Sequence, residues 1–159
     1  MCPFDDMPEE TPSASEWQIR RILHRYCDTI DAGDFEAFAA IFERGTWAIL
    51  EEPGSDAVLR WLKQNVILYD GEPRTKHQMT NLIVDVDDEA GTATFSCYVT
   101  VWQALPDFPL QAFSQAKFRG TFEREDGKWW WKRHDSVLGG LGDTSHHLRN
   151  WQGVPPKDW

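Results

Sequence analysis

The sequence lacks the features that anchor a protein in a membrane or direct it to secretion. Its apolar runs fall well short of the roughly 18 residues that a membrane span needs. Its first ten residues carry neither the basic start nor the apolar stretch of a signal peptide. The three cysteines are odd in number, lie far apart and form no Cys-x-x-Cys pair, which favours reduced thiols over a disulfide framework or a zinc site. We therefore expect a cytoplasmic protein without membrane contact.

Basic residues are also scarce. The 159 residues include 16 Lys and Arg against 26 Asp and Glu, which gives a formal net charge of −10. Nucleic acids and anionic membranes attract basic surfaces, so this balance argues against both as partners. The length suits a single domain. We expect it over residues 13–138, with a flexible arm at 1–12 and a tail at 139–159.

Motifs for several common chemistries are absent. The sequence has no glycine-rich phosphate loop, no Gly-x-Ser-x-Gly nucleophile elbow and no His-Glu-x-x-His zinc motif. Aromatic residues are abundant, in contrast, with nine Trp and nine Phe. Such a density either overfills a hydrophobic core or lines an apolar cavity that receives a small molecule.

Hydrophobic periodicity predicts three helices in the first half of the chain and mostly strands after them. Ser13 and Glu16 form a capping box, and apolar residues then recur at helical spacing as far as Ile30. The predicted helices span 13–32, 34–42 and 55–66, and the predicted strands span 45–50, 76–86, 92–103, 111–123 and 128–138. This order predicts an α+β fold: a strongly curved antiparallel sheet wraps around the helices as a cone, with an apolar pocket between them.

Two residues are candidates for chemistry. Asp31 lies on the shoulder of the apolar stripe at the end of the first helix, and His77 opens a predicted strand. A neutral histidine can act as a general base near neutral pH, and a carboxylate on its other ring nitrogen fixes its tautomer. Each residue alone also fits a plain structural role. Asp31 could be a solvated acid at the end of a helix, and His77 could be a surface or core histidine. The pair His146–His147 has only Asp143 nearby as a further ligand, so we expect no metal site.

The last predicted strand carries three consecutive tryptophans. Alternation places Trp129, Trp131 and Arg133 on one side, and Trp130, Lys132 and His134 on the other. One side would pack in the core and the other would form a contact between copies of the chain. We therefore expect a homodimer or a homotrimer.

Several short segments, in a characteristic order and spacing, indicate a family. They are Ile22–Tyr26, Asp31–Asp34, Phe42, Trp47, His77–Asn81 and Asp126–Trp129. Over residues 15–138 the chain resembles the SnoaL-like branch of the nuclear-transport-factor-2-like superfamily, most specifically in Tyr26-x4-Asp31 and His77-x3-Asn81. The resemblance implies a cone-shaped fold with a deep apolar pocket, and chemistry without cofactor or metal. It also implies that His77 is a base, Asp31 its orienting carboxylate and Tyr26 a phenol donor at the leaving group.

The chain departs from the dehydratases of this family at one place. Some of them carry a second ionisable residue midway along the strand after the hairpin, where this chain has Tyr98-Val-Thr-Val-Trp102. Either a phenol or a threonine hydroxyl replaces that residue, or the second proton-transfer step is absent.

Three functions are compatible with these residues. The first is a cofactor-independent lyase of dehydratase type, or an isomerase, for a hydrophobic cyclic substrate, with Trp47, Asn81, Tyr98 and Trp102 lining the pocket. The second is a non-catalytic binding protein for an apolar ligand. The third is an assembly subunit, with a partner chain and a filled cavity. The tail 139–159 is expected to close the pocket mouth or to contact a neighbouring copy.

Overall fold

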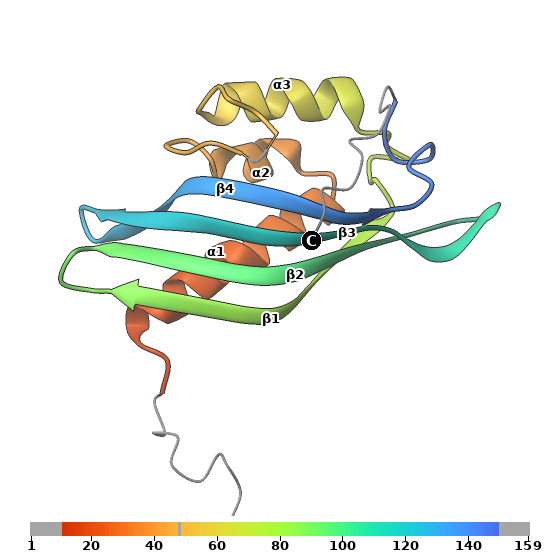
Figure 1. The fold of residues 1–159 in the computed structure, drawn as a ribbon. Coiled ribbons are helices and arrows are strands. Elements are labelled where there is room, and N and C mark those ends of the chain that lie inside the picture. The colour runs from red at the N-terminus through yellow and green to blue at the C-terminus, as the bar shows by residue number, and fades with distance from the viewer. Residues whose placement is uncertain (1–10, 48, 150–159) are drawn as a thin grey trace, which may run out of the picture.

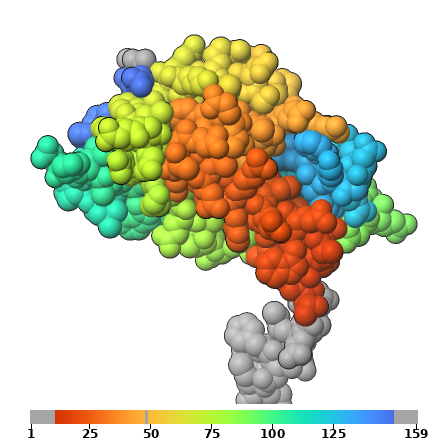
Figure 2. Space-filling view, turned by 180° about the vertical axis from the view of Figure 1, so that it is seen from behind, coloured from red at the N-terminus to blue at the C-terminus, as the bar shows by residue number. Residues whose placement is uncertain are grey.

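A four-stranded antiparallel sheet and three helices form the part of the chain that the computed structural model describes, residues 11–47 and 49–149. The elements are α1 (Ala14–Asp31), α2 (Phe35–Ala40), α3 (Ser55–Asn65), β1 (Thr75–Asp87), β2 (Thr92–Leu105), β3 (Phe108–Glu125) and β4 (Lys128–Leu141). Each strand pairs with the next one along the chain. The helices gather on one side of the sheet (Figure 1) and cover it when seen from behind (Figure 2). The predicted α+β fold is confirmed.

The first helix forms where its cap and its apolar stripe agree. The Ser13 hydroxyl accepts a hydrogen bond from the Glu16 backbone N–H at 3.1 Å, as the capping box predicts. The buried residues of α1 recur every three or four positions: Ser15, Ile19, Leu23, Tyr26, Ile30 and Asp31. Gly33, with a φ of 74°, turns the chain after the helix, and a Cβ there would lie 2.1 Å from the carbonyl oxygen of Gly71. The end of α1 is thereby fixed close to the segment that leads into β1.

The segment 45–50 is not the strand that its apolar residues predict. Thr46 forms a single parallel bridge with Arg133 of β4, and the backbone then turns, with the Leu50 N–H donating to the Trp47 carbonyl at 2.7 Å. Gly45 lies very close to β4, since a Cβ there would lie 2.0 Å from the Trp131 carbonyl oxygen. Glycine at this position therefore allows the backbone of Thr46 to reach the strand. The turn carries Trp47 away from the edge of the sheet and over its concave side, where its ring lines the cavity described below.

Irregularities in the strand pairing bend the sheet. The register shifts between Thr80 and Ile83 in β1, between Val101 and Trp102 in β2, and between Thr121 and Phe122 in β3. Such bulges kink a strand and increase its twist. Asn81 lies in the first of them with a φ of 53°. The long strands therefore curl, and their concave side receives the helices.

A bulge also changes the faces of β4. Thr121 pairs with Arg133 and Phe122 pairs with Trp131, so Lys132 is an extra residue in β4. Trp131 and His134 are consequently both buried, with exposed fractions of 1%. The predicted alternation, which placed these two side chains on opposite sides, is wrong because it assumed an unbroken period of two. Trp130 is half-buried, and the Arg44 guanidinium lies 4.2 Å from the centre of its ring.

Two further expectations concern the membrane and the cysteines. Among the described residues, no helix has the length and the apolarity that crossing a bilayer requires. Cys27 and Cys97 are free thiols, and Cys2 lies outside the described residues. Burial raises the pKa of the Cys97 thiol to about 11, so this thiol is protonated at neutral pH.

The buried His134 predicts a loss of stability in acid. Within the part of the chain that the structure describes, neither of its ring nitrogens has a hydrogen-bond partner, and burial lowers its pKa to about 3. The unfolded chain binds a proton at this residue below a pH of about 6.5, whereas the folded protein does not, so the free energy of unfolding decreases as the pH falls from about 6.5 to about 3.

We expect His134→Leu to remove this part of the pH dependence. Between pH 7 and about pH 4.5 the wild type should lose about 2 kcal/mol more stability than the variant does. Urea unfolding at both pH values measures this difference. An equal loss in both proteins would show that His134 does not take up a proton on unfolding.

Candidate functional site

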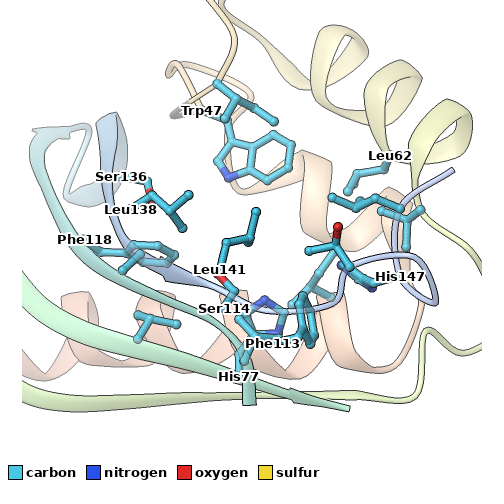
Figure 3. A pocket seen from close by; sticks show the side chains of 18 of the residues that line it. Trp47, Leu62, His77, Phe113, Ser114, Phe118, Ser136, Leu138, Leu141 and His147 are labelled. Carbon is cyan, nitrogen blue, oxygen red and sulfur yellow. The ribbon is translucent and has the colours of Figure 1, made fainter. Parts of the chain in front are cut away.

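A cavity of about 170 Å³ lies between the concave side of the sheet, the segment 47–66 and the residues that follow β4. Most of its lining is apolar: Tyr26, Ile30, Trp47, Ile49, Trp61, Leu62, Val66, His77, Val99, Val101, Phe113, Ser114, Ala116, Phe118, Ser136, Leu138, Leu141, Thr144, His147 and Leu148. Trp47 and His77 face it from opposite sides (Figure 3). An apolar cavity with a few convergent polar groups is the usual form of a small-molecule site.

Asp31 and His77 are brought together, although 46 positions separate them in the sequence. Asp31 is the last residue of α1 and His77 is the third residue of β1. The carboxylate Oδ1 lies 2.6 Å from the imidazole Nδ1 and 2.8 Å from the Thr75 hydroxyl, and Oδ2 accepts from the His77 backbone N–H at 2.7 Å. Both carboxylate oxygens are therefore committed to the start of β1.

These hydrogen bonds set the charge of Asp31. Burial by itself would raise its pKa, but the hydrogen bonds and the charge from His77, together with the Thr75 hydroxyl, outweigh burial and lower the pKa below its usual value. An ionised carboxylate accepts from Nδ1–H, which leaves the lone pair of the imidazole on Nε2. His77 lines the cavity, so this nitrogen is the one available to a bound molecule.

Tyr26, the third predicted residue, also lines the cavity. Its ring centre lies 6.2 Å from that of His77, with the two rings nearly perpendicular. Burial raises the pKa of the Tyr26 phenol above its usual value, although a side-chain hydrogen bond with Trp47 opposes this effect. The phenol is therefore a neutral hydrogen-bond donor.

Of the four predicted lining residues, only Trp47 lines the cavity. Tyr98 and Trp102 lie on the other side of β2, because Val99 and Val101 face the cavity and side chains alternate. Tyr98 is 38% exposed, and the Trp102 indole N–H donates to the Gln78 amide at 3.1 Å. Asn81 is an exposed residue of the β1 bulge. The expectation that these three residues line the cavity is wrong.

His147 was missed as a cavity residue. It lies after β4, is 9% exposed and lines the cavity together with Thr144 and Leu148. The Ile67 N–H donates to the His147 carbonyl at 2.9 Å, which ties residues 142–149 to the chain that follows α3. The sequence signal was the pair His146–His147, but no periodicity placed it near His77. Trp151 and Trp159 of the same tail lie outside the described residues.

The described residues offer no constellation for a metal. Within 11–47 and 49–149, no group of three or more His, Cys, Asp or Glu side chains is placed to hold an ion. Two hydroxyls, of Ser114 and Ser136, add polar groups to the sheet side of the cavity. The groups that can contact a bound molecule are thus hydroxyls, a phenol and imidazoles.

The fold and the cavity define a class, the cone-shaped α+β proteins that hold a cavity between helices and a curled sheet. A variant of Rv3472, a protein of unknown function from Mycobacterium tuberculosis, has this fold with a TM-score of 0.65 and 21% identity, over 80% of this chain and 73% of that one. A candidate scytalone dehydratase from Novosphingobium aromaticivorans gives a TM-score of 0.65 and 20% identity, over 89% and 92%. Aln2 from a Streptomyces species gives 0.64 and 18%, over 80% and 93%.

The family follows from the sequence match. The SnoaL-like domain matches residues 12–135, which is most of the chain, and the chain therefore belongs to the SnoaL-like family. This confirms the predicted resemblance. No curated protein matches the sequence significantly.

The Asp31 hydrogen bonds predict a large contribution to stability. Asp31→Ala would leave the fully buried Thr75 hydroxyl and the His77 N–H groups without an acceptor, so we expect a loss of about 3 kcal/mol in the free energy of unfolding. Asp28→Ala is the matched control, because Asp28 is an exposed acid of the same helix and its loss should change stability by less than about 0.5 kcal/mol. Urea unfolding at pH 7 compares the two variants, and equal effects would contradict a bonded, buried Asp31.

Proposed function

We propose that this protein binds a small cyclic, oxygen-bearing molecule in its cavity and removes a proton from it, as a cofactor-independent lyase or isomerase. The observation that carries this proposal is the Asp31–His77 hydrogen bond of 2.6 Å at an apolar cavity. A carboxylate in a water-poor site stabilises the imidazolium that forms when His77 takes a proton. This arrangement supports general-base chemistry by His77.

In the proposed elimination, His77 Nε2 takes a proton from a carbon next to the one that carries a hydroxyl group. The electron pair of the broken C–H bond forms the new C=C bond, and the C–O bond breaks. Tyr26, a neutral phenol beside His77, donates a hydrogen bond to the departing oxygen. The hydroxide takes up the proton held by His77 and leaves as water, which restores the neutral imidazole.

The cavity size supports a substrate of about one six-membered ring. A volume of about 170 Å³ is close to that of apolar cavities of roughly 150 Å³ that accommodate a benzene molecule. The aromatic side chains Trp47, Phe113 and Phe118 offer flat apolar surfaces to such a ring. A candidate scytalone dehydratase among the structures of similar fold is consistent with an elimination.

A non-catalytic binding protein is the second candidate, and one observation favours it. The side chains that face the cavity from the middle of β2 are Val99 and Val101, which can neither give nor take a proton. If the Asp31–His77 pair only positions a polar group of the ligand, the cavity would bind the ligand without converting it. The presence of an open cavity does not favour an assembly subunit.

The conversion of 3-hydroxycyclohexanone to cyclohexenone and water tests the proposal, followed by the ultraviolet absorbance of the product. We expect the wild type to accelerate the reaction over buffer, and His77→Ala to lower kcat/KM by about 100-fold or more. Asp31→Asn should cause a smaller loss, because it keeps the shape but removes the charge that stabilises the imidazolium.

His24→Ala serves as the control, since His24 is an exposed histidine of α1 outside the cavity. Its rate should match that of the wild type. Full activity in His77→Ala would refute the mechanism. A wild type that binds the ketone without accelerating its conversion would support the binding protein instead.

We also propose self-association through the outer side of the sheet. Ile83 is 58% exposed and Tyr98 is 38% exposed, and both lie on the side of the sheet that faces away from the helices. Light scattering should give two or three times the chain mass of 18.4 kDa. The double variant Ile83→Glu, Tyr98→Glu should give the monomer mass, because it places charges in the contact. A wild-type monomer, or an unchanged mass in the variant, would refute this surface.

A further inference from the structure

The cavity contains a second imidazole that the proposed mechanism does not use. His147 lines the cavity with an exposed fraction of 9%, and its buried Nδ1 has no hydrogen-bond partner among the described residues. A buried polar atom that lacks a partner destabilises a protein, so such atoms are few in native structures and each calls for an explanation. The position of His147 beside a cavity therefore needs an explanation.

The surroundings of His147 hold its side chain at the cavity. Its backbone N–H donates to the Thr144 carbonyl and its carbonyl accepts from the Ile67 N–H, both at 2.9 Å. Its ring centre lies 4.9 Å from that of Phe113, another lining residue. The next residue, Leu148, bridges to Val66 at the end of α3. The imidazole is thus placed at the cavity by hydrogen bonds on its own backbone and by an aromatic neighbour.

The charge state of His147 follows from its burial. Burial, and to a lesser extent the charge of His77, lower its pKa to about 4, whereas Asp31 acts in the opposite direction. His147 is accordingly neutral at pH 7. A neutral imidazole offers one N–H donor and one nitrogen acceptor, and it can polarise a carbonyl group without carrying a positive charge.

We propose that His147 is a ligand-binding residue, whose neutral imidazole forms a hydrogen bond with a carbonyl or hydroxyl oxygen of the ring-shaped molecule in the cavity. The inference rests on the proposed function in that this cavity is the ligand site. It adds a polar contact from the segment after β4, while the facing part of β2 supplies only valines. A ligand oxygen in the cavity would give this imidazole a hydrogen-bond partner, while the described residues supply none to its buried Nδ1.

Two probes of nearly equal shape test this contact. Cyclohexanone and methylenecyclohexane differ only in an oxygen atom against a CH₂ group. Their dissociation constants are measured at pH 7 from NMR shifts of the Trp47 indole N–H, and the ratio of the two constants reports what the oxygen contributes. We expect the preference for the ketone to fall by about tenfold from the wild type to His147→Phe, the size of one hydrogen bond.

His146→Phe is the matched control. His146 precedes His147 and stacks on Phe108 at 4.3 Å, and it does not line the cavity. This variant should keep the wild-type ratio. His147→Leu provides a second apolar replacement if His147→Phe does not fold. An unchanged ratio in the folded His147 variants overturns the proposal, as does a wild type that binds neither probe up to its solubility limit.

The turnover assay separates this inference from the proposed function. If the His147 variants lose the ketone preference and the wild type shows no turnover, the results would support the His147 contact and refute the lyase. Turnover that depends on His77, with a ketone preference that does not depend on His147, would support the lyase and refute the contact.

Discussion

The carboxylate of Asp31 joins the helical layer to the sheet, and the cavity depends on this connection. Its two oxygens bind the Thr75 hydroxyl, the His77 backbone and the His77 ring, all at the start of β1. The same contacts fix the distance between α1 and the sheet and point the imidazole into the space between them. A group that serves the fold and the candidate chemistry together cannot be replaced for one purpose without affecting the other. Gly33 also fixes the end of α1 against the segment that leads into β1, because a side chain there would clash with the Gly71 carbonyl.

The aromatic residues serve both purposes that their number suggested. One group packs around Tyr26 and His134 in the interior, with Phe42, Phe118 and Trp131 in ring contact. The other group, which includes Trp47, Trp61 and Phe113, borders the cavity, and Tyr26 and Phe118 belong to both groups. The cavity persists because the turn after Thr46 and the segment after β4 place large, stiff rings around it, and such rings cannot collapse into the space as flexible side chains would.

The parts of the fold that follow a regular period were predictable from the sequence. Helical spacing identified α1 and placed Asp31 at its buried edge, and the family pattern paired it with His77. The period of two in β2 also indicated that Tyr98 and Trp102 lie opposite Val99 and Val101, so their assignment to the cavity conflicted with the pattern itself. Other features depend on contacts between distant segments, which a local period does not indicate. They are the bulge at Lys132, the turn after Thr46 and the position of His147 beside the chain that follows α3.

The buried imidazoles differ in their access to a negative charge. His77 has an ionised carboxylate on Nδ1, whereas the described residues give His134 and His147 no such partner, and burial lowers the pKa of each. Because burial lowers the pKa of His147 to about 4, its imidazole is a neutral dipole at pH 7, whereas the His77 ring is hydrogen-bonded to the Asp31 carboxylate. His134 is enclosed by aromatic rings and does not line the cavity. The asymmetry arises from one carboxylate at the end of one helix, and it gives two cavity imidazoles of the same residue type different electrostatic surroundings.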